Sequence, residues 1–349
     1  MKAARIIEPD KPLELNQIEI SDPIGTQVLI KVISTGVCHS DLHLWEGGYD
    51  TGDGFMKVTD RGVKFPVTPG HEVVGNIEKI GESVKDVKIG DTVLVYPWIG
   101  CGNCPTCQKG DTNLCESPKS LGVFQDGGYA EKVIVPDFKF LANIGDVNPD
   151  SASSLACSGL TAYTAIKKAL VNNPESILIV GAGGLGLMGV QLASHMAKCK
   201  IICADLDDEK LNIAKELGAT HIVNTKESDA AQKIMSICDD KGVDSIVDFV
   251  NAPPTVKLDL SVIRKRGNII LVGLFGGSIE LPLVSVPLKA ITIQGAYTGN
   301  YKDMVELIEL AKKGVINPVV SKHYTLDEAT HALDDLKNRK ILGRAVINP

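Results

Sequence analysis

The side chains best suited to metal chemistry lie in two short segments, residues 36–43 and 70–72, which contain Cys38 and His71 respectively. Thiolate sulfur and imidazole nitrogen are ligands that Zn²⁺ prefers, and a catalytic zinc takes three protein ligands and keeps one position open. We take Cys157 as the candidate third ligand. Cys38 alone is better explained as a buried thiol, and His71 alone as a hydrogen-bonded core histidine. The zinc hypothesis therefore rests on the combination.

A second group of cysteines has the spacing of a structural metal site. Two C-x-x-C steps share their middle cysteine, and a fourth cysteine follows after seven intervening residues: Cys101, Cys104, Cys107 and Cys115. One short loop can fold four such sulfurs into a closed tetrahedral zinc site. An iron–sulfur cluster is the main rival, but the ferredoxin pattern needs its fourth cysteine sooner and followed by proline, whereas Glu116 follows here. Redox-active thiols are a further alternative, and we favour structural zinc.

Residues 181–186 fit the dinucleotide-binding pattern G-x-G-x-x-G. The pattern is weak alone, but here it follows an apolar run at 177–180 and precedes a predicted helix at 185–198, which is the required context. Its glycines permit a tight turn, approach of a pyrophosphate and close helix packing, and the helix N-terminus presents free N–H groups to phosphate. The predicted cofactor contacts are Gly181, Gly183, Gly184, Leu185 and Gly186.

The residue expected to choose between NAD and NADP is Asp205. It lies 19 residues after Gly186, at the end of the next predicted strand. A carboxylate there accepts hydrogen bonds from the adenosine ribose hydroxyls and repels a 2′-phosphate. Its neighbours Leu206, Asp207 and Asp208 include no arginine, so we expect NAD to be favoured over NADP.

Composition excludes several other classes of protein. The chain has 349 residues, enough for two domains, with 44% hydrophobic and 23% charged residues. A net charge of −7 disfavours a nucleic-acid or anionic-membrane partner. Nine cysteines without an apolar N-terminal segment favour a reducing cytoplasm. Residues 177–197 lack charge, but their glycines argue for a buried strand and helix rather than a membrane span.

The predicted elements change character near residue 149. Before it, short strands such as 28–32, 73–77 and 92–95 suggest a small β-barrel or sandwich. A helical stretch at 151–170 follows, and then strands alternate with helices, which is typical of an α/β domain with a parallel sheet. The later predicted elements are strands at 200–205, 221–223, 245–249, 268–272, 291–293 and 344–347, and helices at 208–217, 302–313 and 326–337.

The segment at residues 47–64 has glycines and charges but few apolar pairs, and we predict a loop extension near the metal site.

Together these features resemble the zinc-dependent alcohol dehydrogenases of the medium-chain dehydrogenase/reductase superfamily. The resemblance covers essentially the whole chain and rests on the three metal and nucleotide motifs and on residues 36–41, 157–161 and 343–344. The extension at 47–66 is similar to that of prokaryotic and archaeal tetrameric members. The resemblance implies a GroES-like β-rich catalytic domain at 1–157, with a structural zinc lobe at about 98–117. It further implies a Rossmann domain at 158–297, a return to the catalytic domain at 298–349, and an active site between the domains.

The resemblance also implies roles for single residues. Cys38, His71 and Cys157 match the catalytic zinc ligands. Glu72 matches a carboxylate that can bind the metal transiently, and Asp41 matches the carboxylate that orients the ligating histidine. Ser40 matches the hydroxyl that takes the substrate proton, and His43 is placed to relay that proton. Matches to cofactor contacts are Thr161 near the nicotinamide, Lys210 at the ribose, Arg344 at the pyrophosphate, and Val272, Gly273 and Leu274 after a strand. His39 stands where the family often has arginine near the phosphates, so that contact is expected to be weaker.

The implied reaction is hydride transfer between NAD(H) and an alcohol or its aldehyde or ketone, semialdehydes included, with two zinc ions per chain and a homo-oligomeric, favoured tetrameric, assembly. One alternative is a polyol or amino-alcohol dehydrogenase of the same superfamily, which often differs at the third ligand. Another is a metal-free, nucleotide-binding quinone reductase-like protein, which would make the Cys38 and His71 pair incidental. The sequence leaves the substrate itself open.

Overall fold

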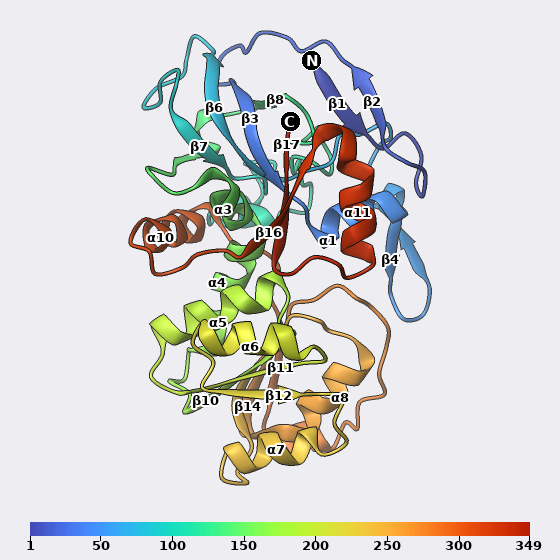
Figure 1. Ribbon diagram of the computed structural model, residues 1–349, viewed down its shortest axis with the longest axis vertical. Coiled ribbons are helices and arrows are strands. Elements are labelled where there is room, and N and C mark those ends of the chain that lie inside the picture. Colours follow the sequence, from blue (N-terminus) through green and yellow to red (C-terminus); the bar gives the residue numbers. More distant parts are fainter. The chain divides into compact units, whose positions relative to one another are not determined.

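Figure 1 shows a computed structural model, which describes residues 1–349. The chain forms two compact units. The first unit contains Met1–Gly48, Lys57–Leu160 and Gly299–Pro349, and the second contains Tyr49–Met56 and Thr161–Thr298. No helix combines the length and the apolar composition needed to cross a membrane.

The first unit is built on a seven-stranded sheet in the order β16-β17-β3-β6-β7-β9, with β8 also paired to β3. Every residue of the central strand β3 except two is buried, as expected of its apolar run. The strands are β3 (Val28–Gly36), β6 (Glu72–Ile80), β7 (Thr92–Val95), β8 (Lys132–Val135), β9 (Leu141–Asn143), β16 (Val320–Thr325) and β17 (Arg344–Asn348), with a separate hairpin of β1 (Lys2–Arg5) and β2 (Glu14–Gln17).

The C-terminal strand β17 lies within this sheet, between β16 and β3. In Figure 1 the red strand β17 lies beside the blue strand β3, and the register places Val346 opposite Gly36. This pairing brings residues from the two ends of the sequence to one place. The helices of this unit are α1 (His39–Glu46), α2 (Pro105–Gln108), α3 (Pro149–Ser153), α10 (Tyr301–Lys312) and α11 (Ala329–Lys337), with 3-10 turns η1 (Val58–Arg61), η2 (Thr112–Leu114), η3 (Phe138–Phe140), η4 (Ser154–Ala156) and η5 (Leu326–Glu328).

The single helix predicted at 151–170 is wrong in one respect. The structure has α3, the 3-10 turn η4 and then α4 (Ser158–Ala169), with a break at Cys157. Cys157 has φ −131° and ψ −75°, which no α-helix allows. Helical periodicity on both sides conceals this break in the sequence, and it sets Cys157 apart from both helices.

The second unit is a six-stranded, fully parallel sheet in the order β12-β11-β10-β13-β14-β15, as predicted from the alternation of strands and helices. The doubly wound order begins at β10 in the centre and runs outward in both directions. The strands are β10 (Ser176–Val180), β11 (Lys200–Asp205), β12 (His221–Asn224), β13 (Val243–Asp248), β14 (Ile263–Leu271) and β15 (Thr292–Gly295).

Helices cover both faces of this sheet. Figure 1 shows α5 (Gly184–Met196) and α6 (Asp208–Glu216) on one face, and α7 (Ala230–Ile237) and α8 (Pro253–Val262) on the other. The apolar residues of α7 and α8 pack with those of the strands in one buried core. A short helix, α9 (Ser285–Lys289), precedes β15. The uncharged stretch 177–197 is thus a strand, a turn and a helix, as predicted.

The extension predicted as a loop at 47–64 contains a hairpin instead. Its strands are β4 (Gly48–Asp50) and β5 (Phe55–Lys57), and its tip, Tyr49–Met56, packs with the second unit. The contact is close, because a Cβ atom built on Gly52 would lie 2.5 Å from the backbone of Gly277. Alternation of apolar residues is absent here, so period-two analysis has no signal to detect.

Candidate functional site

Four potential metal ligands meet in the first unit. Cys38, His71, Glu72 and Cys157 each place one ligand atom within 4.8 Å of all the others, and all four side chains are buried. The two sulfurs are 3.9 Å apart. Two thiols, one imidazole and one carboxylate form a donor set that suits Zn²⁺.

The sheet of the first unit explains this meeting. Cys38 follows the end of β3 and caps the N-terminus of α1, and Glu72 begins β6. Because β3 and β6 are antiparallel with Gly36 opposite Glu72, the end of one strand lies beside the start of the other. Cys157 reaches the same place from the break between η4 and α4.

Asp41 connects the two segments that supply the cluster. Its Oδ1 lies 3.0 Å from His71 Nδ1 and accepts the backbone N–H of Gly70 at 3.1 Å. Its Oδ2 accepts the backbone N–H of Cys38 at 3.0 Å. A carboxylate on Nδ1 orients the ring and leaves Nε2 free to bind a metal. One buried side chain therefore sets the position of both segments.

The state of the donor atoms is that expected of metal ligands. Nε2 of His71 is buried and has no hydrogen-bond partner, which is costly for an isolated polar atom but expected of a metal ligand. The hydrogen bond from Cys157, followed by the effect of His71, holds the pKa of Cys38 well below its usual value despite burial. The same pairing and burial raise the pKa of Cys157. Thiols that share a proton in this way release it when a metal binds.

Glu72 lies in the cluster but has other partners. It forms a buried ion pair with Arg344 and accepts the backbone N–H of Ser158 at 3.2 Å. Burial raises its pKa to about 7, although Arg344 opposes the shift. These contacts hold the carboxylate beside the three other ligands, where Arg344 competes with a metal for it.

The predicted proton-transfer residues lie on α1. Ser40 and His43 are three residues apart and therefore share one face of the helix. Both are partly exposed, and His43 Nδ1 lies 3.9 Å from Glu46 Oε2. Burial lowers the pKa of His43, with Glu46 opposing the shift. A neutral imidazole next to a hydroxyl on one helical face is able to pass a proton outward. His39, at the start of the same helix, also has a pKa lowered by burial.

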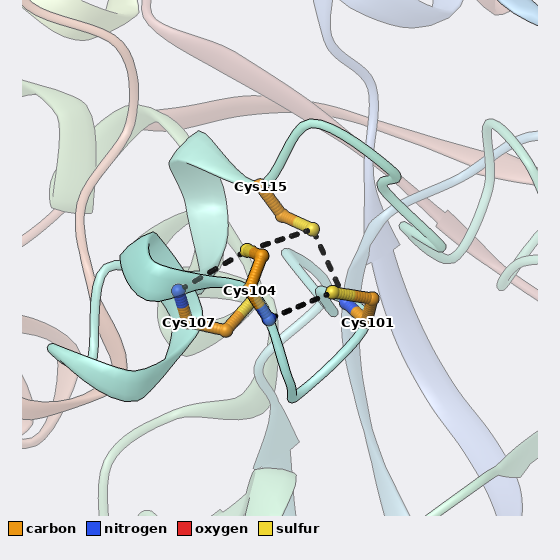
Figure 2. Close-up of side chains that lie close together, drawn as sticks. All are labelled: Cys101, Cys104, Cys107 and Cys115. Atoms are coloured by element: carbon orange, nitrogen blue, oxygen red, sulfur yellow. Dashed lines mark hydrogen bonds between the residues drawn. The ribbon is translucent and has the colours of Figure 1, made fainter.

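The four-cysteine loop forms a second cluster, shown in Figure 2, in which all four sulfurs lie within 4.8 Å of one another. Backbone N–H groups donate to the sulfurs: Cys104 to Cys101, Cys107 to Cys104, and Cys101 to Cys115, at 3.2–3.4 Å. Hydrogen bonds from Asn103 and Cys104 lower the pKa of Cys101 to about 6. No carboxylate or imidazole joins this group, which is the composition of a closed, structural site.

Few apolar contacts support this lobe apart from its anchor to the rest of the first unit. Tyr96 lies beneath it, and its hydroxyl donates to the carbonyl of Gly299 at 2.9 Å and lies 3.2 Å from Thr112 Oγ1. Asn300 donates to Asp111 at 3.2 Å. Several of the lobe's side chains are exposed, so the cluster itself must provide much of its stability.

The glycine motif has the predicted structure in the second unit. Gly181 follows β10 with φ +92°, and Gly183 caps α5 without a side-chain hydrogen bond, so the first N–H groups of the helix remain available. Leu185 and Gly186 lie in the first turn of α5. A Cβ on Gly186 would lie 1.7 Å from the carbonyl oxygen of Gly181, so only glycine fits there. This turn is built to receive a phosphate.

Asp205 ends β11 beside the glycine motif. Its Oδ2 accepts the N–H of Ala182 at 2.6 Å, and its Oδ1 accepts the N–H of Asp207 at 3.0 Å. Asp207 in turn caps α6 and accepts the N–H of Lys210. The structure thus places this carboxylate next to the glycine turn, the position from which a ribose-binding acidic residue acts in dinucleotide-binding folds.

The other predicted cofactor residues divide between the units. Thr161, in α4, and Val272 and Gly273, after β14, are buried, whereas Leu274 is exposed, and all four belong to the second unit. His39 and Arg344 belong to the first unit. The structure thus places each of these predicted residues in a defined element of its own unit.

Three further residues support the metal cluster, although no sequence motif gave them a role there. The Trp98 ring packs 5.3 Å from that of His71, and its Nε1–H donates to the carbonyl of Ala156 at 2.9 Å. Tyr129 is fully buried with its hydroxyl 3.5 Å from Asp41. Ser158 donates its N–H to Glu72. These partners are 27 to 88 residues apart, so only a comparison of many related sequences could have found them.

Comparison with known proteins gives a consistent result. Residues 25–146 match the family described as "Alcohol dehydrogenase GroES-like domain", and residues 184–313 match "Zinc-binding dehydrogenase". An NAD-dependent alcohol dehydrogenase of Saccharolobus solfataricus is 40% identical over the full length of both chains. An alcohol dehydrogenase from Aeropyrum pernix has a TM-score of 0.91 at 34% identity over the full length of both chains. The D-arabinose dehydrogenase from Sulfolobus solfataricus has a TM-score of 0.85 at 28% identity, covering 100% of this chain and 99% of the other.

Proposed function

This chain belongs to the zinc-dependent alcohol dehydrogenases, and we propose that it interconverts alcohols with aldehydes or ketones at the cluster of Cys38, His71 and Cys157, using NAD(H). The observation that carries this assignment is the buried, unpartnered Nε2 of His71 between two thiols. A metal-free quinone reductase-like protein would have no reason to leave that nitrogen without a partner.

The residues of the cluster fit a catalytic zinc. Cys38, His71 and Cys157 would hold it as three protein ligands, with one position left open for the alcohol. Glu72 is a possible fourth ligand whose carboxylate is ion-paired with Arg344. When bound there, zinc supplies a Lewis acid that lowers the pKa of the alcohol and polarises the carbonyl. Asp41 keeps the His71 ring in the orientation that binding requires.

The proton leaves through α1 in this proposal. The Ser40 hydroxyl would accept the alcohol proton as it releases its own. That proton would pass by way of the nicotinamide ribose to His43, one turn further along α1, and then to solvent. The lowered pKa of His43 keeps the imidazole neutral at pH 7 and ready to accept a proton. In the direction of carbonyl reduction, the same two side chains return a proton to the product.

The reaction is tested by supplying zinc-replete protein with NAD⁺ and a series of primary and secondary alcohols, semialdehydes in the reverse direction, and D-arabinose as a sugar comparator. We expect NADH formation with simple alcohols at rates above those with the sugar, because the third ligand is a cysteine, as in the alcohol branch of the family. Faster turnover of the sugar would favour the polyol alternative. Unchanged turnover after removal of the catalytic zinc would contradict the proposal.

Cofactor preference depends on Asp205. Because its carboxylate also braces the glycine motif through Ala182, serine is the sharper substitution, since its hydroxyl can still accept a hydrogen bond. We expect Asp205→Ser to lower kcat/KM with NADH by about tenfold, which is the scale of one lost charged hydrogen bond. The same change should raise kcat/KM with NADPH. Asp207→Ser is the matched control, because serine still caps α6. An unchanged ratio of the two cofactors in Asp205→Ser would contradict this role.

A homo-oligomer is supported by the free edge of the parallel sheet. β15 is the last strand in the sheet, and exposed apolar side chains surround it: Leu283, Val284, Leu288 and Ile293. Such an edge normally needs a partner. We expect light scattering to give the mass of a tetramer, and Ile293→Lys to give a smaller species.

The nine free cysteines further support a reducing, cytoplasmic location.

A further inference from the structure

Two buried carboxyl groups lie together in the second unit, outside the metal and nucleotide motifs. Asp248 ends β13, Asp259 lies in α8, which packs against β13, and both side chains have 0% exposure and lie within hydrogen-bonding reach of each other. Neither carboxylate oxygen of Asp259 has a hydrogen-bond donor. Two adjacent buried carboxylates repel each other strongly unless one of them keeps a proton. This pair therefore needs an explanation.

The hydrogen bonds of Asp248 show where that proton fits. Its Oδ1 accepts the N–H groups of Val250 and Asn251, both at 2.8 Å, and its Oδ2 accepts the Thr255 hydroxyl at 2.7 Å. An ionised carboxylate has about four acceptor positions, so one remains. The O–H of a protonated Asp259 would fill it. Burial and the charge of Asp248 both hold the pKa of Asp259 well above its usual value.

The turn that Asp248 holds touches two loops assigned to the cofactor. Asn251, at φ +57°, donates its side-chain N–H to the carbonyl of Gly273 at 2.9 Å. A Cβ on Gly273 would lie 2.0 Å from the carbonyl oxygen of Val250, and a Cβ on Gly181 would lie 2.7 Å from the Val250 side chain. A shift of this turn would therefore displace both glycine loops.

We infer that Asp259 is a neutral carboxylic acid whose O–H donates a hydrogen bond to the Asp248 carboxylate and so positions the turn at residues 249–251 against the cofactor loops. Asp259 is a positioning residue, since it acts through Asp248 and the turn. The inference rests on the proposed function only for the identity of the nucleotide. Binding of NADH without turnover tests it separately from the zinc chemistry.

The first test is NADH affinity, measured by fluorescence titration at pH 7 on zinc-loaded protein. Asp259→Asn keeps a donor toward Asp248, so its Kd should stay within about twofold of the parent value. Asp259→Ala and Thr255→Val each remove one donor to Asp248, and each should raise the Kd about tenfold, the scale of one charge-assisted hydrogen bond. Asp146→Asn, an exposed change in the first unit, is the control.

Two outcomes would overturn the inference. Parent-like affinity in Thr255→Val and Asp259→Ala would show that the turn does not need these donors. Equal weakening in Asp259→Asn and Asp259→Ala would show that Asp259 acts as a carboxylate. If Asp259→Ala does not fold, the other two variants still test the inference. A parent-like Kd in Thr255→Val would contradict the inference, and so would a raised Kd in Asp259→Asn.

The second test is the pH dependence of stability. Asp248 is the charged side chain placed against Asp259, and its own Oδ2 accepts the Thr255 hydroxyl. The unfolded chain loses the Asp259 proton near its ordinary pKa, whereas the folded protein keeps it to higher pH, so stability falls as pH rises between those two values. The asparagine side chain has no proton that titrates in this pH range. The urea midpoint of Asp259→Asn relative to the parent should therefore be higher at pH 8 than at pH 5, and an equal difference at both would contradict a protonated Asp259.

Discussion

Cys38→Ser should lose one of the two zinc ions per chain and lower turnover at least about a thousandfold while the protein remains folded. Cys38 is one of three ligands of an open site, and a metal acting as a Lewis acid stabilises the transition state by several kcal/mol, with each 1.4 kcal/mol worth tenfold in rate. The fold should persist, because Asp41 still accepts the backbone N–H of residue 38. Elemental analysis, initial rates and thermal unfolding measure the three quantities.

The control for this prediction is Cys199→Ser. It makes the same chemical change at a partly exposed cysteine outside both clusters. We expect this variant to keep two zinc ions and parent-like turnover. Full zinc content together with parent-like turnover in Cys38→Ser would refute the assignment of Cys38 as a ligand.

Cys104→Ser should show the opposite division of effects, a large loss of stability with much of the turnover per folded chain retained. Cys104 accepts the N–H of Cys107 and lies 3.8 Å from the sulfur of Cys115, so its loss opens the closed cluster. A closed zinc site contributes directly to the folding free energy, and the lobe has little other core. We expect the thermal midpoint to fall by about 5 °C or more.

Limited proteolysis adds a local measurement to this prediction. The lobe of Cys104→Ser should be cut within residues 98–117 under conditions that leave the parent and Cys199→Ser intact, because local unfolding exposes backbone to the protease. Equal losses of midpoint in Cys38→Ser and Cys104→Ser would show that the two clusters do not have separate catalytic and structural roles.

Local motifs explain why much of the site was predictable. The four cysteines of the lobe lie within fifteen residues, and a short loop can bring them together whatever the rest of the chain does. The glycine motif likewise encodes its own turn, since Gly181 needs a positive φ and Gly186 has no space for a side chain. Alternating strands and helices indicate a parallel sheet in the same local way.

Other parts depended on pairing between distant segments. The ion pair of Glu72 with Arg344 joins residues 272 positions apart, and it exists because β17 pairs with β3 while β3 pairs with β6. The break at Cys157 and the hairpin at 49–56 also departed from the predicted helix and loop. In each case tertiary contacts outweigh the local preference of the sequence.

By itself, then, the sequence determined which side chains can hold zinc and nucleotide, because the chemistry of thiolate, imidazole and glycine turns is a property of residue type and short spacing. The family resemblance also implied Asp41 beside His71, and only the tertiary structure decided which other side chains stabilise these sites. Trp98 packs against His71, Tyr129 lies 3.5 Å from Asp41, and Asp248 with Asp259 holds the turn that contacts the cofactor loops. Sheet register and burial specify such partners. A buried polar group is stable only where a matching donor or acceptor, here from a distant segment of the chain, forms a hydrogen bond with it.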